Sequence, residues 1–244
     1  IVGVDDSWCQ RICTEITAAN RRTIWPVSAG RAMGRGVYVL QGVLYDATGD
    51  RVVEVVDLTN AKSLPGRHNW QNAAAAYGAV RALGVSIEDA AEGLMTFPGL
   101  VHRMETVAVS DGVRFVNDSK ATNADAARQA MSSYPRFFWI AGGVPKSGGI
   151  EPLTDLFGRV AKAYLVGEAA DAFATTLDGK AEMARCNSVQ DAAAAAFDDA
   201  KQEAARTGRE AVVLLSPACA SFDQFPDFEA RGEAFRAAVL GLIG

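Results

Sequence analysis

Seven consecutive residues, Asn117 to Asn123, combine an acid, an amine and small polar side chains in one short loop. The apolar run 112–116 before it is typical of a strand, and the alanine-rich run 124–131 after it is typical of a helix. Open α/β sheets bind ligands where a strand ends and the next helix begins. Backbone N–H groups near Thr122 and Asn123 are therefore expected to face an anion, and the loop suits phosphate or carboxylate chemistry.

Two further loops of unusual composition also follow apolar runs. Residues 141–149 contain paired glycines and Lys146, and residues 216–225 contain Ser221 beside Phe222. A glycine pair beside a lysine, taken alone, is most often a tight turn with a solvated side chain. Three such loops after strands favour a site, because the carboxyl ends of parallel strands meet at one edge of a sheet.

Strands and helices alternate beyond residue 100, which predicts a Rossmann-like, mostly parallel sheet with flanking helices. A hairpin is expected first, because Asp111-Gly112 separates two apolar runs. Further strands are expected at 137–141, 163–166, 181–185 and 211–215, and helices at 124–131, 152–160, from 168, at 188–206 and at 228–243.

The first hundred residues are expected to form the tail of a separate α/β domain. We expect helices over Ser7–Asn20, from Gly66 to about Leu83, and after a Ser86 cap, with strands at 22–27, 36–40 and 51–56. Pro98-Gly99 is the expected linker between a domain of residues 1–99 and one of residues 100–244, and either a hinge or a fixed connection is compatible with it.

Composition excludes several classes of function. The net charge of −5 and the lack of a basic patch with interleaved aromatic residues argue against a nucleic-acid partner, and no 18-residue apolar run calls for a membrane. The four cysteines form no zinc-type pairs, and the two histidines, His68 and His102, lack metal-ligand spacing, so no metal site is expected. Neither a dinucleotide fingerprint nor a phosphate-loop motif is present.

Five motifs, taken in order and spacing, resemble the ATP-dependent Mur ligases of bacterial cell-wall synthesis. They are Gly66-Arg67-His68-Asn69-x-x-Asn72-Ala73, Gly99-Leu100-x-His102-Arg103-x-Glu105, the Asn117–Asn123 loop, Gly142-Gly143-x-x-Lys146, and the run from Ser216 to Gly232. The loop 118–123 and the run 216–225 look particular to the family member that adds D-glutamate.

The resemblance implies amide-bond formation through an acyl phosphate. ATP would phosphorylate the L-alanine carboxylate of UDP-N-acetylmuramoyl-L-alanine, and the amine of D-glutamate would then attack. The resemblance thus implies ATP and Mg²⁺ as cofactors, these two substrates as partners, and a cytoplasmic monomer that serves peptidoglycan synthesis, cell shape and cell division. The phosphoryl group and the tetrahedral intermediate are both anionic, so cations and amide donors are required.

The resemblance also assigns roles to individual residues. By similarity, Asn72 binds the adenine and His68 lies close to the nucleotide, while Arg103 and Asp118 hold the ribose and phosphate region. Lys120 faces the reacting phosphate, so Lys120 and His68 are the expected catalytic residues. The expected D-glutamate pocket consists of Thr122, Lys146, Ser221, Phe228 and, through its backbone, Phe222. A substrate with two carboxylates needs such cations and hydroxyls, because a buried unpaired carboxylate is costly.

The chain also departs from the family pattern. No UDP-binding domain, phosphate loop, magnesium ligands or modified lysine precede Ile1, so residues 1–99 are expected to be the C-terminal part of the central ATP-binding domain. We expect this polypeptide alone to be inactive. Two alternatives stay open: another Mur-type or folylpolyglutamate-type ligase with a different amino acid, and a noncatalytic α/β binding module.

Overall fold

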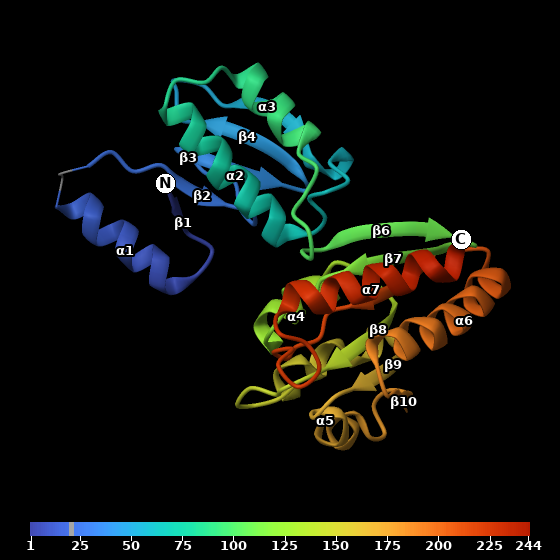
Figure 1. The fold of residues 1–244 in the computed structure, drawn as a ribbon. Helices are drawn as coiled ribbons and strands as arrows, with labels where there is room; N and C mark the ends of the chain where they lie inside the picture. Colours follow the sequence, from blue (N-terminus) through green and yellow to red (C-terminus); the bar gives the residue numbers. More distant parts are fainter. Residues whose placement is uncertain (20–21) are drawn as a thin grey trace. The chain divides into compact units, whose positions relative to one another are not determined.

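The chain forms two compact units, Ile1–Pro98 and Gly99–Gly244, and each of them is built from a β-sheet with helices (Figure 1). The structure is a computed structural model that describes residues 1–19 and 22–244. Each unit has a hydrophobic core of its own, with one cluster in the first unit and two in the second.

The first unit contains a five-stranded sheet in the order β1-β2-β3-β4-β5. Strands β1 to β3 are parallel, whereas β3, β4 and β5 are joined as antiparallel neighbours. The strands are β1 Val2–Gly3, β2 Pro26–Ser28, β3 Gly36–Leu40, β4 Val43–Ala47 and β5 Val53–Asp57, and the helices are α1 Ser7–Ala18, the short 3₁₀ helix η1 Leu58–Asn60, α2 Arg67–Ala82 and α3 Ile87–Thr96.

Two elements of this unit differ from the expectation. Strand β4 was not expected; it pairs with β3 through a tight turn in which Gln41 and Gly42 have φ of 53° and 89°. The strand expected at 22–27 instead covers Pro26–Ser28. The first expected helix ends at Ala18, and the Asn20 end of that expectation lies outside the described residues.

Helix α2 is fixed to the first sheet by small side chains and one buried polar contact. Ala73, Ala74 and Tyr77 are buried in the same cluster as the apolar residues of β2, β3 and β4. The Tyr77 hydroxyl donates a 2.7 Å hydrogen bond to buried Asp46 on β4. A buried carboxylate is stable only when it is hydrogen-bonded, so this contact holds α2 at one position along the strand.

The second unit contains a six-stranded sheet in the order β10-β9-β8-β11-β7-β6. Only the β6–β7 hairpin is antiparallel, which confirms the predicted mostly parallel sheet with flanking helices. The strands are β6 Glu105–Ser110, β7 Val113–Asn117, β8 Phe137–Gly142, β9 Val160–Val166, β10 Met183–Arg185 and β11 Ala211–Leu215. The helices are α4 Ala124–Ser132, the 3₁₀ helix η2 Glu151–Arg159, α5 Ala170–Leu177, α6 Val189–Thr207 and α7 Phe228–Ile243.

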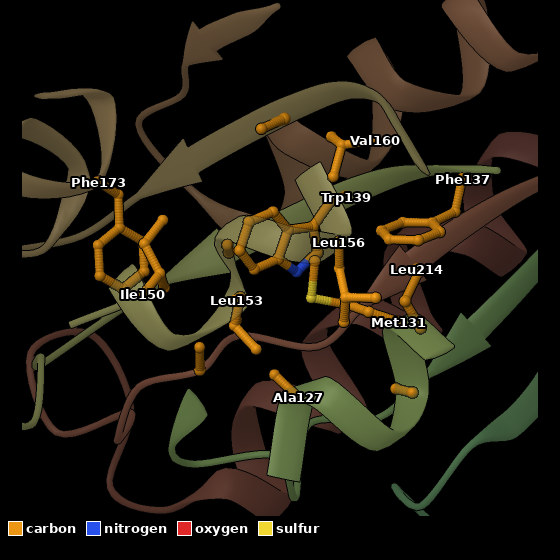
Figure 2. Packing of buried hydrophobic residues seen from close by; sticks show 14 of the residues in the cluster. Ala127, Met131, Phe137, Trp139, Ile150, Leu153, Leu156, Val160, Phe173 and Leu214 are labelled. Carbon is orange, nitrogen blue, oxygen red and sulfur yellow. The ribbon is translucent and has the colours of Figure 1, made fainter. Parts of the chain in front are cut away.

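Both faces of this sheet are covered, because its central strands are apolar on both sides. Along β8, Phe137 and Trp139 join the cluster under α4, η2 and α5, while Phe138 and Ile140 join the cluster under α6 and α7. This alternation follows from the two-residue period of a strand. Figure 2 shows the Trp139 ring among the side chains of the first of these clusters.

The order of the central strands decides where the unusual loops lie. Strands β8, β11 and β7 are adjacent and parallel, so their carboxyl ends lie at one edge of the sheet. The loops at residues 143–150, 216–227 and 118–123 start from these three ends. We call this edge the loop rim, and the sheet topology places it where α/β folds bind ligands.

Candidate functional site

Asp118 joins two of the three rim loops. Its backbone N–H donates to the Leu215 carbonyl at 2.7 Å, and its carboxylate accepts from the Ser216 hydroxyl at 2.9 Å and from the Met104 N–H at 3.3 Å. Burial raises the pKa of Asp118 to about 7, against the opposing effects of the Ser216 and Met104 hydrogen bonds and the Arg103 charge. Near neutral pH this carboxyl is therefore protonated in a substantial fraction of molecules.

Arg103 lies between two strained residues. His102 and Met104 have φ of 61° and 50°, a left-handed conformation that costs non-glycine residues about 1–3 kcal/mol each. The conformation is held by hydrogen bonds from the His102 N–H to Glu105 Oε2 at 3.0 Å and from the Met104 N–H to Asp118. This strained turn leaves the Arg103 side chain exposed at the start of the second unit.

Lys120 is half-buried and its backbone is fixed on both sides. Its N–H donates to the His102 carbonyl at 3.1 Å, and its carbonyl accepts from the Thr122 N–H at 2.8 Å. The Lys120 ammonium lies 3.8 Å from the centre of the Phe228 ring. The Thr122 N–H is thus engaged within its own loop and does not face an anion, whereas the expectation for the Asn123 N–H stays a prediction. The Asn123 side chain instead caps α4 by accepting from the Ala126 N–H at 2.8 Å.

The loops after β8 and β11 are joined through their backbones. Val144 and Ala220 exchange two hydrogen bonds of 2.9 and 3.1 Å, and the Gly142 N–H donates to the Pro217 carbonyl at 2.9 Å. Gly142 has a φ of 129°, and a Cβ atom there would lie 1.9 Å from the Val166 carbonyl oxygen. The close approach of the β9 backbone at Val166 therefore requires glycine at this position.

The five residues expected to bind the amino acid belong to the loop rim and the start of α7. Lys146 is exposed, Thr122 and Phe228 are half-buried, and Ser221 is buried, while Phe222 is 73% exposed. In the part of the chain that the structure describes, no hydrogen bond engages the side-chain polar atoms of Thr122, Lys146 or Ser221. These groups lie on neighbouring loops, although no contact joins them directly.

Three rim cations lack an acidic partner. Within residues 1–19 and 22–244, no carboxylate lies within ion-pair distance of Arg103, Lys120 or Lys146. An unpaired cation next to small polar groups is suited to bind an anionic ligand, because charge-assisted hydrogen bonds are the strong ones. The arrangement therefore fits a phosphate or carboxylate.

Arg231 is a structural centre of the rim that the sequence analysis did not recognise. Its side chain is almost fully buried and donates to the Ser119 hydroxyl at 3.0 Å, to the Ser119 carbonyl at 2.8 Å and to the Cys219 carbonyl at 3.1 Å. Burial lowers the pKa of Arg231 to about 10. One side chain thus holds the loops after β7 and β11 at a fixed spacing.

Asn117 was also assigned no role from the sequence. Its side-chain amide donates toward His102 Nδ1 at 3.0 Å and the Gly232 carbonyl at 3.2 Å, and its Oδ1 accepts from the Ser119 N–H at 3.2 Å. Both Asn117 and Arg231 stand within the quoted motifs, but partners about a hundred residues away cannot be read from local spacing.

His68 and Asn72 lie in the first unit, four residues apart on α2 and hence on the same helix face. Asn72 is exposed, and its amide has no hydrogen-bond partner in the described residues. Burial lowers the pKa of His68, so its ring is neutral at pH 7. A neutral ring and a free amide on one helix face are suited to contact a nucleobase or sugar.

The described ranges hold neither a metal-ligand cluster nor a membrane-spanning helix. These ranges contain no group of three or more His, Cys, Asp or Glu side chains that could hold a metal ion. None of their helices has both the length and the apolar character needed to cross a bilayer.

Comparison with known proteins shows what the chain is similar to. Residues 102–219 match the family described as "Mur ligase, glutamate ligase domain". Over 242 residues the chain is 73% identical to the "UDP-N-acetylmuramoylalanine--D-glutamate ligase" of Caulobacter vibrioides (strain NA1000 / CB15N), a match that covers 99% of this chain and 50% of that protein. The chain is therefore similar to Mur ligases. It is also 71% identical over 239 residues to the protein of the same name from Phenylobacterium zucineum (strain HLK1), covering 98% of the chain and 50% of that protein.

The chain spans about half the length of the curated relatives it matches. Among solved structures, Mycobacterium tuberculosis folylpolyglutamate synthase complexed with ADP and AMPPCP shares its fold with a TM-score of 0.62. The sequence identity is 14%, and the match covers 98% of this chain and 53% of that one. At that identity the likeness shows the fold alone, and it agrees with the α/β architecture of this chain.

Proposed function

We propose that this chain is part of an ATP-dependent ligase that joins D-glutamate to UDP-N-acetylmuramoyl-L-alanine in peptidoglycan precursor synthesis. The observation that carries the proposal is the 73% identity, over 99% of the chain, to a protein named for that reaction. The three unpaired rim cations support it, because the reaction passes through anionic groups.

Each unit carries residues that we propose for nucleotide binding. ATP, when bound, supplies the phosphoryl group that activates the alanine carboxylate. Asn72 would bind the adenine, and His68 would lie close to the nucleotide. Arg103, Asp118 and Lys120 would hold the ribose and the phosphates. The free amide of Asn72 and the unpaired cations fit such a ligand. Lys120 would then stabilise the negative charge of the reacting phosphate.

Mg²⁺ is a proposed cofactor of the whole ligase, but its ligands are not assigned to this chain. The described residues offer no cluster of three or more acidic, histidine or cysteine side chains. Mg²⁺ prefers carboxylates together with substrate phosphates.

The loop rim is proposed to bind D-glutamate. Lys146 would pair with one carboxylate, while the Thr122 and Ser221 hydroxyls and the backbone at Phe222 would serve the other, beside the ring of Phe228. Burying two carboxylates requires such partners, because each unpaired charge is costly to remove from water. The unengaged polar atoms of Thr122, Lys146 and Ser221 support this assignment.

Isothermal titration of D-glutamate into the chain tests the assignment. Lys146→Ala and Thr122→Ala should each weaken binding about tenfold or more, since a hydrogen bond to a charged group contributes about 1.5–3 kcal/mol. Lys180→Ala is the matched control, because Lys180 carries the same charge but donates to the Thr176 carbonyl on α5. Titrations that are unchanged by both rim substitutions would rule out D-glutamate binding at this rim.

The proposal favours D-glutamate over the amino acid of another Mur-type or folylpolyglutamate-type ligase, because the relatives at 71–73% identity share one reaction name. The same names favour an enzyme over a noncatalytic binding module. We further propose a cytoplasmic monomer that serves cell-wall growth and cell division, with neither a nucleic-acid nor a membrane partner.

A further inference from the structure

The ring of Phe228 lies directly beneath a charged group. The Lys120 ammonium lies 3.8 Å from the ring centre, well inside the range of about 6 Å over which a cation is attracted to an aromatic face. The ring is also arranged edge-to-face with His102, at a centroid distance of 6.3 Å and an interplanar angle of 81°. Phe228 therefore neighbours one residue of the strained turn and one of the β7 loop.

Both members of this contact are held in place by their backbones. The Lys120 backbone is fixed by His102 and Thr122, as described above. The Phe228 carbonyl accepts a 2.7 Å hydrogen bond from the hydroxyl of Ser119, the residue directly before Lys120. Arg231 in turn donates to the same hydroxyl at 3.0 Å. The distance between the lysine and the ring is thus set by the buried network of the rim.

No carboxylate competes for the ammonium. Asp118 is two residues away, but it is buried and its oxygens accept from Ser216 and Met104. Within the described residues Lys120 has no ion-pair partner. A carboxylate at contact distance would neutralise this cation, whereas a ring face leaves its charge available to an anion.

We propose that Phe228 is a positioning residue for Lys120, with its ring face holding the ammonium at the rim in place of an acidic partner. This role differs from that of a substrate-pocket residue, because Phe228 acts through the lysine. An arriving phosphate or carboxylate would then draw the ammonium from the ring without first breaking an ion pair. That last step rests on the proposed function, but the contact itself does not.

The contact can be measured without any substrate. In protein labelled with ¹³C and ¹⁵N at lysine, the side-chain signals of Lys120 are assigned by their loss in Lys120→Arg. Protons above an aromatic face are shifted upfield, so the Lys120 ε-methylene signals should lie upfield of those of the other lysines. Phe228→Leu should abolish that shift, whereas Phe228→Tyr and Phe228→Trp should preserve it.

Phe222→Leu is the matched control, since Phe222 lies in the preceding loop, is 73% exposed and makes no contact of this kind in the described residues. It should leave the Lys120 signals in place. Circular dichroism of every variant checks that the fold is kept. Identical Lys120 shifts in the unaltered chain and in Phe228→Leu would overturn the proposal. D-glutamate binding, by contrast, is measured by calorimetry. A failure of the proposed function can therefore be told apart from a failure of the proposed Lys120–Phe228 contact.

Discussion

The raised pKa of Asp118 makes the stability of the second unit depend on pH in an unusual direction. The carboxyl titrates near 7 in the folded chain, against its usual 3.8. Between these pH values the folded state binds more protons than the unfolded state. Asp118 therefore makes its full contribution to the free energy of unfolding below pH 3.8, and this contribution is lost as the pH rises through 7. At 1.36 kcal/mol for each pH unit, the loss between pH 4 and pH 8 is about 4 kcal/mol.

Asp118→Asn should remove this dependence while keeping the contacts. The amide oxygen can still accept from the Met104 N–H, and the amide nitrogen can donate to the Ser216 oxygen. The free energy of unfolding of the variant, minus that of the unaltered chain, should therefore increase by about 4 kcal/mol from pH 4 to pH 8. All other titrating groups are shared by the two proteins and cancel in this difference.

Urea titrations followed by Trp139 fluorescence provide the assay. Trp139 is the single tryptophan of residues 99–244, so Trp8, Trp25 and Trp70 are replaced by phenylalanine in both proteins. Asp178→Asn, which changes an exposed carboxyl of the same unit, is the control for the substitution itself. A difference for Asp118→Asn that stays flat, or that falls toward pH 8, would refute the reasoning.

Three further substitutions test the construction of the rim by urea denaturation. Arg231→Lys keeps the charge but loses the forked contacts to Ser119, and should lower the free energy of unfolding by about 3 kcal/mol; an unchanged midpoint would contradict this. Gly142→Ala should cost more than about 2 kcal/mol, because its Cβ meets the Val166 carbonyl and its φ is 129°. Asn123→Ala removes the α4 cap and should cost about 1 kcal/mol, and no loss would show that the cap is dispensable.

The fold was largely predictable where local signals are strong. The Asp111-Gly112 turn marked the hairpin, and the Ser86 cap marked a helix start that the structure confirms. Strand β4 was missed, because its turn uses Gln41-Gly42 rather than one of the common hairpin dipeptides. These elements were predicted correctly where the chain uses a common turn or cap sequence, and β4 was missed because its turn does not.

The candidate site was predictable in its position but not in its construction. Parallel topology brings the β7, β8 and β11 loops to one edge, as the alternation of elements indicated. The roles of Asn117 and Arg231 depend on partners about a hundred residues away, which a single sequence does not reveal. The use of the Thr122 N–H within its own loop is equally invisible, because it follows from the backbone path after Lys120.

The paired hydrogen bonds between Val144 and Ala220 have a consequence for how such a protein can change its substrate. Since the main chain supplies these bonds, they persist whichever side chains the two loops carry. Exposed positions such as Lys146 and Phe222 can therefore be exchanged while the supporting framework stays intact. Redesign of the proposed amino-acid preference should begin at these exposed positions and leave the glycines and Arg231 untouched.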